Sequence, residues 1–509
     1  MPLYVPDDTI GTGVQFEPLN GDIFIIREGI EIISTTGNAF ASGSADSVAL
    51  NIAGWVHGYG SAILLNASSQ YADFDVSIGT TGQVSSSAGN GMRIWGNYDS
   101  PGGTASIQNA GIIQTEGLSV NLQRFDTIAI DNAGLIVSSS TVSTQSYAIF
   151  AVGHDIRIVN SGTISRASAA TDPFLGGATI TAVNWSGRVA GDYLSVTNTG
   201  FIFSPNQAIG SQNGVDHIIN DGLIEGKILL GWDETGAGYD DVLINRGDIY
   251  GDIDLGAGQD ELLGQTGFIE GTIDAGAGDD LIKSGTGDDM IIGGAGADEM
   301  WGGAGVDTAS YEGSADGVRV SLNAGRGWYG DAQGDALHEI ENLIGSDRKD
   351  TLIGSSLANQ LEGGNADDVL NGLSGDDTIF GGNGADNILG GSGNDYISGD
   401  RHQDKLTGGT GEDIFAFLNI LDSGPAQSER DNITDFTQGQ DLIDLTELGD
   451  LFFGGTAFSG AAGEIIYYHV AGGTRTVVEI DTDGDSVADF GILLSNAAHT
   501  MTAADFLFV

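Results

Sequence analysis

GGNADDVLN, GLSGDDTIF, GGNGADNIL, GGSGNDYIS, GDRHQDKLT and GGTGEDIFA follow one another without an insertion over residues 363–416. Each nonapeptide has an aspartate at its sixth place and an apolar residue at its eighth place. Glycine permits the positive φ angles of sharp turns. The apolar eighth place falls on the inward face of a short strand, because strand side chains alternate between faces. One nonapeptide cannot bury that face alone, so the period predicts a stack of coils.

The sixth-place aspartates are candidate metal ligands. Turns rich in glycine point carbonyl oxygens inward, and calcium prefers carbonyl and carboxylate oxygens. We therefore expect multiple Ca²⁺ ions. Four further copies fill residues 275–310, and GSDRKDTLI follows at residues 345–353. The candidate aspartates are Asp280, Asp289, Asp298, Asp307, Asp350, Asp368, Asp377, Asp386, Asp395, Asp404 and Asp413, and the candidate turn glycines are Gly363, Gly381, Gly384, Gly390 and Gly393.

This repeat resembles the RTX, or hemolysin-type, calcium-binding nonapeptide. The resemblance implies a parallel β-roll with two nonapeptides in each coil and calcium ions in rows between stacked turns. The alternative is a disordered Gly/Asp-rich linker, since polar low-complexity tracts often cannot fold. The regular spacing of apolar residues argues against that alternative. Because stacked carboxylates repel each other, we expect folding to depend on calcium.

A second repeat, Ile-x-Asn-x-Gly-x-Ile, recurs before the nonapeptides. Its clear copies are IQNAGII (107–113), IDNAGLI (130–136), IVNSGTI (158–164), VTNTGFI (196–202), IINDGLI (218–224) and LINRGDI (243–249). The pattern predicts strand, turn and strand, with β-branched residues inside. We expect a parallel β-helix whose asparagines stack into a hydrogen-bonded ladder; independent hairpins are the alternative. The repeat resembles those of β-helical bacterial surface proteins.

Composition restricts the possible partners. The 509 residues include 71 Asp and Glu against 17 Lys and Arg, a net charge of −54, which disfavours binding to nucleic acid. No run of apolar residues is long enough for a membrane span.

The first residues, MPLYVPDDTIGTGVQF, lack the basic and apolar regions of a Sec signal peptide. The absence of cysteine leaves metal as the stabilising cross-link in an exported protein.

The last hundred residues contain RDNITDFTQGQDLIDL (430–445), TVVEIDTDGDSVADFGILL (476–494) and the terminal ADFLFV (504–509). They resemble the C-terminal domain of serralysin-type metalloproteases. That resemblance implies recognition by a type I secretion apparatus, and an extracellular or cell-surface location in a Gram-negative bacterium. Within this segment Asp481, Asp483 and Asp485 surround Gly484, as in a calcium loop. A charged hairpin turn is the alternative for this loop.

These observations predict an all-β chain with a parallel β-helix, a parallel β-roll and a small C-terminal β cap. The expected segments are residues 1–250 (β-helix), 251–310 (first nonapeptide block), 311–344 (spacer), 345–416 (second β-roll) and 417–509 (secretion domain).

No catalytic residues are expected. The early arginines are isolated, His57, His154 and His217 stand alone, and His338-Glu339 lacks the second histidine of a zinc protease. We therefore expect a structural protein of the surface-layer, matrix or adhesin type, which assembles with itself or binds cell-surface polysaccharide. The alternative is a polysaccharide lyase or C5-epimerase with its site on the β-helix.

Overall fold

The computed structural model consists of two compact units, Met1–Gly287 and Asp288–Val509. Both are built from β-strands with short 3₁₀ helices, and the described residues contain no α-helix. The five segments expected from the sequence stay a prediction. The structure describes residues 2–5, 9–11, 22–27, 30–34, 38–41, 47–67, 71–96, 102–139, 147–166, 179–183, 193–212, 214–231, 238–264, 266–470 and 472–508.

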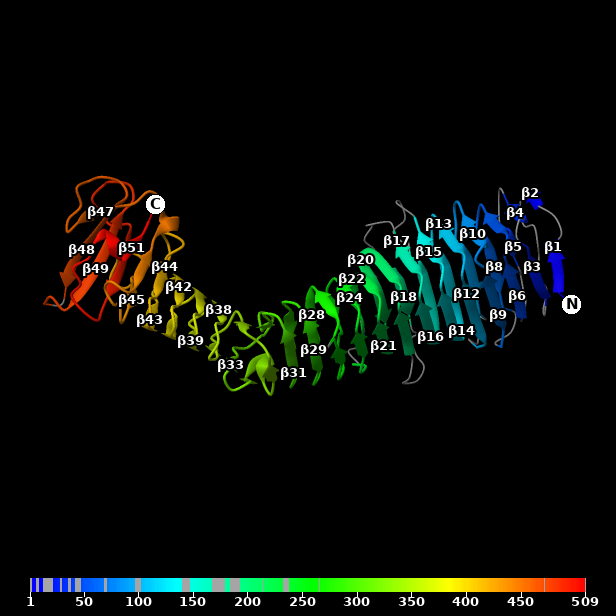
Figure 1. Ribbon diagram of the computed structural model, residues 1–509, viewed down its shortest axis with the longest axis horizontal. Helices are drawn as coiled ribbons and strands as arrows, with labels where there is room; N and C mark the ends of the chain where they lie inside the picture. Colours follow the sequence, from blue (N-terminus) through cyan, green and yellow to red (C-terminus); the bar gives the residue numbers. More distant parts are fainter. Residues whose placement is uncertain are drawn as a thin grey trace. The chain divides into compact units, whose positions relative to one another are not determined.

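The first unit is a parallel β-helix with three faces, which confirms the fold expected for it (Figure 1). Its first face contains β1 (Pro2–Val5), β3 (Asp22–Ile26), β6 (Ser47–Ile52), β9 (Asp73–Ile78), β12 (Thr104–Asn109), β14 (Val120–Asn132), β16 (Ile149–Asn160), β19 (Tyr193–Asn198), β21 (Val215–Asn220), β23 (Val242–Asn245), β26 (Glu261–Leu263) and β29 (Leu281–Thr286).

The second face contains β2 (Thr9–Gly11), β4 (Glu31–Ser34), β7 (Trp55–Gly58), β10 (Gln83–Ser86), β13 (Ile112–Thr115), β15 (Leu135–Ser138), β17 (Thr163–Arg166), β20 (Phe201–Gln212), β22 (Leu223–Leu229), β24 (Asp248–Tyr250) and β27 (Phe268–Glu270). The third face contains parts of β14, β16, β20 and β22 together with β5 (Phe40–Ala41), β8 (Ile63–Asn66), β11 (Met92–Trp95), β18 (Ile180–Val183), β25 (Ile253–Asp254) and β28 (Thr272–Asp274).

The core of the β-helix consists of columns of like residues along its axis. Successive rungs pair in register, so each inward side chain lies on the equivalent side chain of the next rung. One such buried column contains Ile107, Ile130, Ile158, Val196 and Ile218. Branched side chains suit this stacking, because they pack closely on a pleated surface.

The second unit contains the β-roll. Nonapeptides 18 residues apart stack on each other, so two nonapeptides form each coil, as the resemblance implied. The apolar eighth places are buried: Leu370, Ile379, Ile388, Ile397, Leu406 and Phe415. Its strands are β30 (Met290–Ile292), β31 (Glu299–Ala304), β32 (Thr308–Ser310), β36 (Asn342–Ile344), β37 (Thr351–Ile353), β38 (Gln360–Asn365), β39 (Val369–Ser374), β40 (Thr378–Asn383), β41 (Asn387–Ser392), β42 (Tyr396–Arg401), β43 (Lys405–Thr410) and β44 (Ile414–Ala416).

The coil imposes its backbone even where the repeat lacks glycine. Leu373 and Asp400 occupy second places that glycine fills in other copies, and they keep positive φ angles of 73° and 59°. Such angles are unfavourable for residues with a Cβ atom. The stacked neighbours must therefore stabilise these turns.

A spacer and a cap complete the second unit. The spacer adds β33 (Arg319–Ser321), β34 (Arg326–Trp328), the 3₁₀ helix η1 (Gly330–Ala332) and β35 (Ala336–His338). The cap extends the roll, because β45 and β46 pair in parallel with β43 and β44. Its elements are β45 (Asp431–Ile433), β46 (Leu442–Asp444), η2 (Thr446–Leu448), β47 (Phe452–Gly455), β48 (Glu464–Val470), β49 (Arg475–Asp481), β50 (Phe490–Leu494), η3 (Ala503–Asp505) and β51 (Phe506–Leu507).

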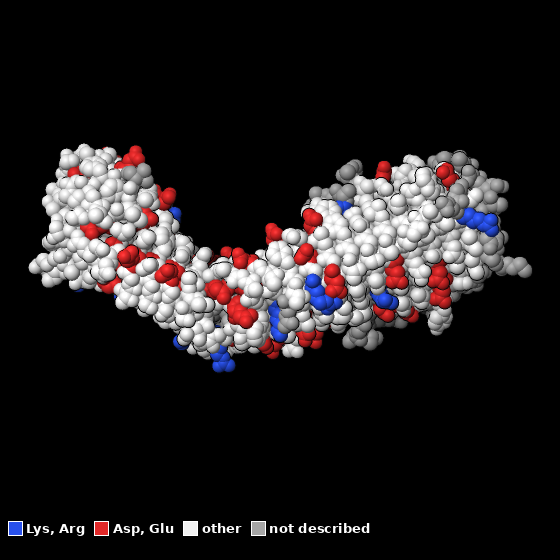
Figure 2. Space-filling view, in the orientation of Figure 1, with Lys and Arg blue, Asp and Glu red and all other residues white. Residues whose placement is uncertain are grey.

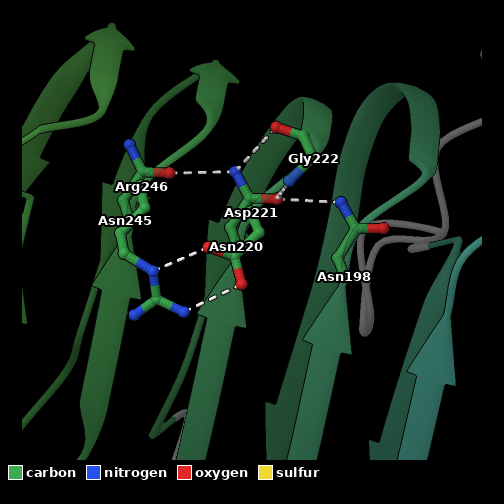
Figure 3. Close-up of polar contacts among 6 residues, drawn as sticks. All are labelled: Asn198, Asn220, Asp221, Gly222, Asn245 and Arg246. Atoms are coloured by element: carbon green, nitrogen blue, oxygen red, sulfur yellow. Dashed lines mark hydrogen bonds and ion pairs between the residues drawn. The ribbon is translucent and has the colours of Figure 1, made fainter.

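Asparagines at the corner between the first and second faces form the expected ladder (Figure 3). The amide nitrogen of each donates to the amide oxygen of the next, at 2.7–2.9 Å. Each nitrogen also donates to a backbone carbonyl one rung further on, as Asn160 does to Phe201 at 3.2 Å. All members are buried: Asn109, Asn132, Asn160, Asn198, Asn220 and Asn245. The ladder therefore satisfies the polar groups of the corner without water.

Replacing Asn160 with alanine should destabilise the middle of the ladder by about 1–3 kcal/mol, because the amide nitrogen of Asn132 loses an acceptor and the amide oxygen of Asn198 loses a donor, and each of these atoms keeps only its longer bonds to backbone groups at 3.2–3.3 Å. Hydrogen exchange of β14, β16 and β19 in the full chain would measure the free energy of local opening. Asn51→Ala, at an exposed position of β6, is the control. An equal effect of the two substitutions would contradict a structural role for the ladder.

Candidate metal centres

The aspartates of the nonapeptides form two columns, one along each side of the roll. In one column the backbone N–H of Asp368 donates to Oδ1 of Asp386, and that of Asp386 donates to Oδ1 of Asp404, both at 2.7 Å. In the other column Asp377 donates to Asp395, and Asp395 to Asp413, both at 3.0 Å. Each carboxylate therefore uses one oxygen to connect two coils.

The second carboxylate oxygen is the unusual feature of these columns. It is buried and accepts no hydrogen bond. A buried carboxylate without a partner is costly, so such groups are normally paired or coordinate metals. The aspartates with such an Oδ2 atom include Asp307, Asp368, Asp377, Asp386, Asp395, Asp404 and Asp413.

Glycine at the first place of the repeat leaves room beside this oxygen. A Cβ atom on Gly363, Gly381 or Gly390 would lie 2.7, 2.4 or 2.3 Å from Oδ2 of the aspartate five residues later. Gly384 and Gly393 serve the packing between coils, since a Cβ atom there would lie 1.8 or 2.0 Å from a carbonyl oxygen of the preceding coil. Only glycine therefore permits both the coil spacing and the space around the carboxylates.

Burial also makes these acids weak. Desolvation, followed by the charges of Asp386 and Asp350, raises the pKa of Asp368 to about 8. Desolvation and the neighbouring Asp431 raise the pKa of Asp404 to about 10. At neutral pH these groups hold protons unless a cation stabilises their charged form.

The donor set fits calcium. It consists of carboxylate and backbone oxygens without nitrogen or sulfur, the ligands that a hard cation prefers. The sixth-place aspartates would hold the ion, and the first-place glycines leave space for it. Figure 2 shows further acidic side chains on the visible surface of each unit and only scattered basic ones.

The remaining predicted aspartates are also buried, and Asp350 differs from them in its hydrogen bonds. Asp280, Asp289 and Asp298 are 3%, 2% and 1% exposed. Both oxygens of Asp350 accept hydrogen bonds from Ser346, so this carboxylate is already partly satisfied.

Asn359 takes the sixth place of the nonapeptide GSSLANQLE (354–362), where the other copies have aspartate. Its amide accepts from Ser355 N–H at 2.6 Å and donates to the Glu341 carbonyl at 2.7 Å. These bonds occupy the amide where an aspartate would offer a free oxygen.

Four column members lie outside any nonapeptide. Asp335 and Glu341 in the spacer accept from the N–H groups of Asp298 and Asp307. Asp431 and Asp441 in the cap accept from Asp404 and Asp413. They follow their partners by 27 to 37 residues, a separation that the nonapeptide period does not predict.

The C-terminal acidic loop brings its three predicted ligands together. One ligand atom from each of Asp481, Asp483 and Asp485 lies within 4.8 Å of the others. Asp481 is buried, and its two oxygens accept from the N–H groups of Gly484 and Ser486. Those bonds build the turn, and each of the two exposed aspartates uses one oxygen to accept from a backbone N–H two residues later in the chain.

Comparisons with known proteins agree with this geometry. Residues 274–309 match the family described as RTX calcium-binding nonapeptide repeat (4 copies), and residues 299–508 match Peptidase M10 serralysin C terminal. Both resemblances are thereby confirmed, and they indicate a secreted, calcium-binding protein of Gram-negative bacteria. In the described part of the chain, no helix is long and apolar enough to cross a membrane.

Solved structures similar to the chain include two subunits of the mannuronan C5-epimerase of Azotobacter vinelandii. The AlgE6R2 subunit is 27% identical, with 30% of this chain and 90% of that chain covered and a TM-score of 0.20. The AlgE6R3 subunit is 28% identical, with 30% and 80% covered and a TM-score of 0.19. Comparison with curated proteins finds no match.

Replacing Gly381 with alanine should weaken calcium binding without straining the backbone, since Gly381 does not have a positive φ. The added Cβ atom would lie 2.4 Å from Oδ2 of Asp386 and 2.7 Å from the carbonyl oxygen of Gly399. We expect the calcium concentration at half-folding, measured by circular dichroism, to rise about tenfold. This corresponds to a loss of about 1.4 kcal/mol in the free energy of calcium binding. Gly313→Ala is the control, because its Cβ atom would meet nothing within 4 Å. Equal midpoints for the two variants would contradict the assigned site.

Proposed function

We propose that this chain, which carries RTX calcium-binding nonapeptide repeats and a serralysin C-terminal domain, is a non-enzymatic structural protein. It is exported by a type I secretion apparatus, folds on calcium outside the cell and remains at the cell surface. Its role is that of a surface-layer, matrix or adhesin protein. The roll and cap serve export and folding, and the β-helix meets the external partner.

The buried, unpaired carboxylate oxygens of the roll are the observation that supports this proposal most strongly. They make the folded roll unfavourable until a cation enters. Calcium modules outside cells bind at high micromolar to millimolar concentrations, about 10⁻⁴–10⁻³ M, so the low calcium of the cytosol leaves such a roll unfolded. An unfolded chain suits passage through a secretion channel.

The second face of the β-helix offers a contact surface for a polysaccharide. Phe201 and Phe203 on β20 stack at 5.9 Å, and Tyr250 on β24 and Phe268 on β27, two and three strands further along this face, lie 5.6 Å apart. We call these residues and Leu223, which pairs with Phe201, the aromatic patch. Aromatic faces pack on the apolar faces of sugar rings, and the nearby carboxylate of Glu225 can accept from hydroxyl groups. Self-assembly through this patch is the other outcome that binding experiments would report.

Without calcium, the full chain should lack β structure in the second unit, because its stacked aspartates remain without a cation. Circular dichroism should show an increase in β signal on calcium addition, and limited proteolysis should show protection of residues 345–416. Magnesium at the same concentration is the control, since it retains its water more strongly. A calcium-free roll that already resists protease would refute the proposal.

A second candidate function is suggested by polar pairs on the first face. Sequence reasoning treated His154 and His217 as isolated, but His154 Nδ1 lies 3.2 Å from Oδ1 of Asp126. Tyr193 Oη lies 3.4 Å from Nδ1 of His217. The register places Arg157 in the same row as His217, two rungs away. A Tyr–His pair with an arginine two rungs away on the same face suits proton abstraction beside a uronate carboxylate, as in a lyase or C5-epimerase.

A uronate-product assay decides between the two candidates. Our first proposal predicts no product from alginate or pectate with the calcium-loaded chain. Product formation that Tyr193→Phe abolishes would establish the enzyme instead. Tyr71→Phe, which changes a tyrosine 72% exposed, is the matched control and should leave any activity unchanged.

A further inference from the structure

One inward-facing column of the β-helix changes its chemistry along the axis. Equivalent positions on the first face are apolar in the earlier rungs and acidic in the later ones. All of them are at most 3% exposed. In order, the column contains Phe74, Ala105, Ile128, Ile156, Leu194, Asp216, Asp241, Asp260 and Asp280.

The acidic part repeats the bonding pattern of the roll. The N–H of Asp216 donates to Oδ1 of Asp241 at 2.7 Å, and the N–H of Asp241 donates to Oδ1 of Asp260 at 2.6 Å. Ser211 Oγ donates to Oδ1 of Asp216 at 3.0 Å. Oδ2 of both Asp216 and Asp241 is buried and accepts no hydrogen bond.

Packing does not account for these acids. Leucine fills the same place one rung earlier, at Leu194, and the strands on either side keep the same register. Two buried carboxylates on adjacent rungs are far more costly than such an apolar pair, unless a cation or a shared proton compensates. The absence of a side chain at Gly231 leaves room beside Asp241, because a Cβ atom there would lie 3.4 Å from Oδ2 of Asp241 and 2.9 Å from the carbonyl oxygen of Leu255.

We propose that Asp216 and Asp241 hold a divalent cation, calcium by its oxygen ligands, between β21 and β23 of the β-helix. These residues precede the matched nonapeptides at residues 274–309. The inference goes beyond the proposed function, because it assigns a metal site to rungs of the Ile-x-Asn-x-Gly-x-Ile type. Calcium would then stabilise the last rungs of the β-helix as well as the roll.

Hydrogen exchange of the full chain, with and without calcium, tests this site. In the parent chain, calcium should raise protection of β21 and β23 at least about tenfold. Asp216→Asn should abolish that local increase while leaving calcium-dependent protection of β39 and β41 intact. Asp131→Asn, the same change at an exposed position of β14, is the matched control and should behave as the parent.

A second variant keeps the test decisive if Asp216→Asn unfolds these rungs. Asp216→Leu restores the residue type of Leu194 and should make the protection of β21 and β23 high and independent of calcium. Calcium-insensitive protection of β21 and β23 in the parent would overturn the inference and favour a shared proton. Calcium-insensitive protection of β39 and β41 would instead refute the proposed function, so the two failures are distinguishable.

Discussion

An ionised carboxylate accepts hydrogen bonds but donates none, whereas a carboxamide both donates and accepts. This difference separates the two buried ladders of the chain. In the asparagine ladder, Asn132 donates to Asn160 and Asn160 donates to Asn198, so each amide satisfies the next. In the aspartate columns the backbone N–H of one coil satisfies one oxygen, as from Asp368 to Asp386, and the other oxygen has no donor. One ladder is complete by itself, and the other requires a cation.

The two ladders explain how a single chain combines two kinds of stability. The rungs around Asn160 need only their own amides and apolar columns. The coils around Asp386 bury charge instead, and their glycines keep space for an ion where a side chain would stabilise an ordinary core. Folding of the roll therefore becomes a response to its surroundings. Asp216 and Asp241 place the beginning of that dependence inside the β-helix.

Much of this arrangement could be predicted from the sequence, because its determinants are local and periodic. The nonapeptide predicted the buried sixth and eighth places, and the Asn-x-Gly motif predicted the amide ladder. Asp216 could not be predicted in this way, since its partner Asp241 lies 25 residues away. In addition, Asp216 does not follow the Gly-x-Gly turn of a nonapeptide. Asp335, Asp431 and Asp441 were missed because the spacer and the cap interrupt the period. The pair of Tyr193 and His217 depends on the register of two rungs, which variable corners between the strands conceal.

Anomalous diffraction from crystals of the calcium-loaded chain tests the central claim most directly. The account predicts anomalous peaks beside the Oδ2 atoms of Asp368, Asp386 and Asp404 in one column, and of Asp377, Asp395 and Asp413 in the other. Folded coils without such peaks, in which the aspartates hold protons and bond to each other, would contradict it.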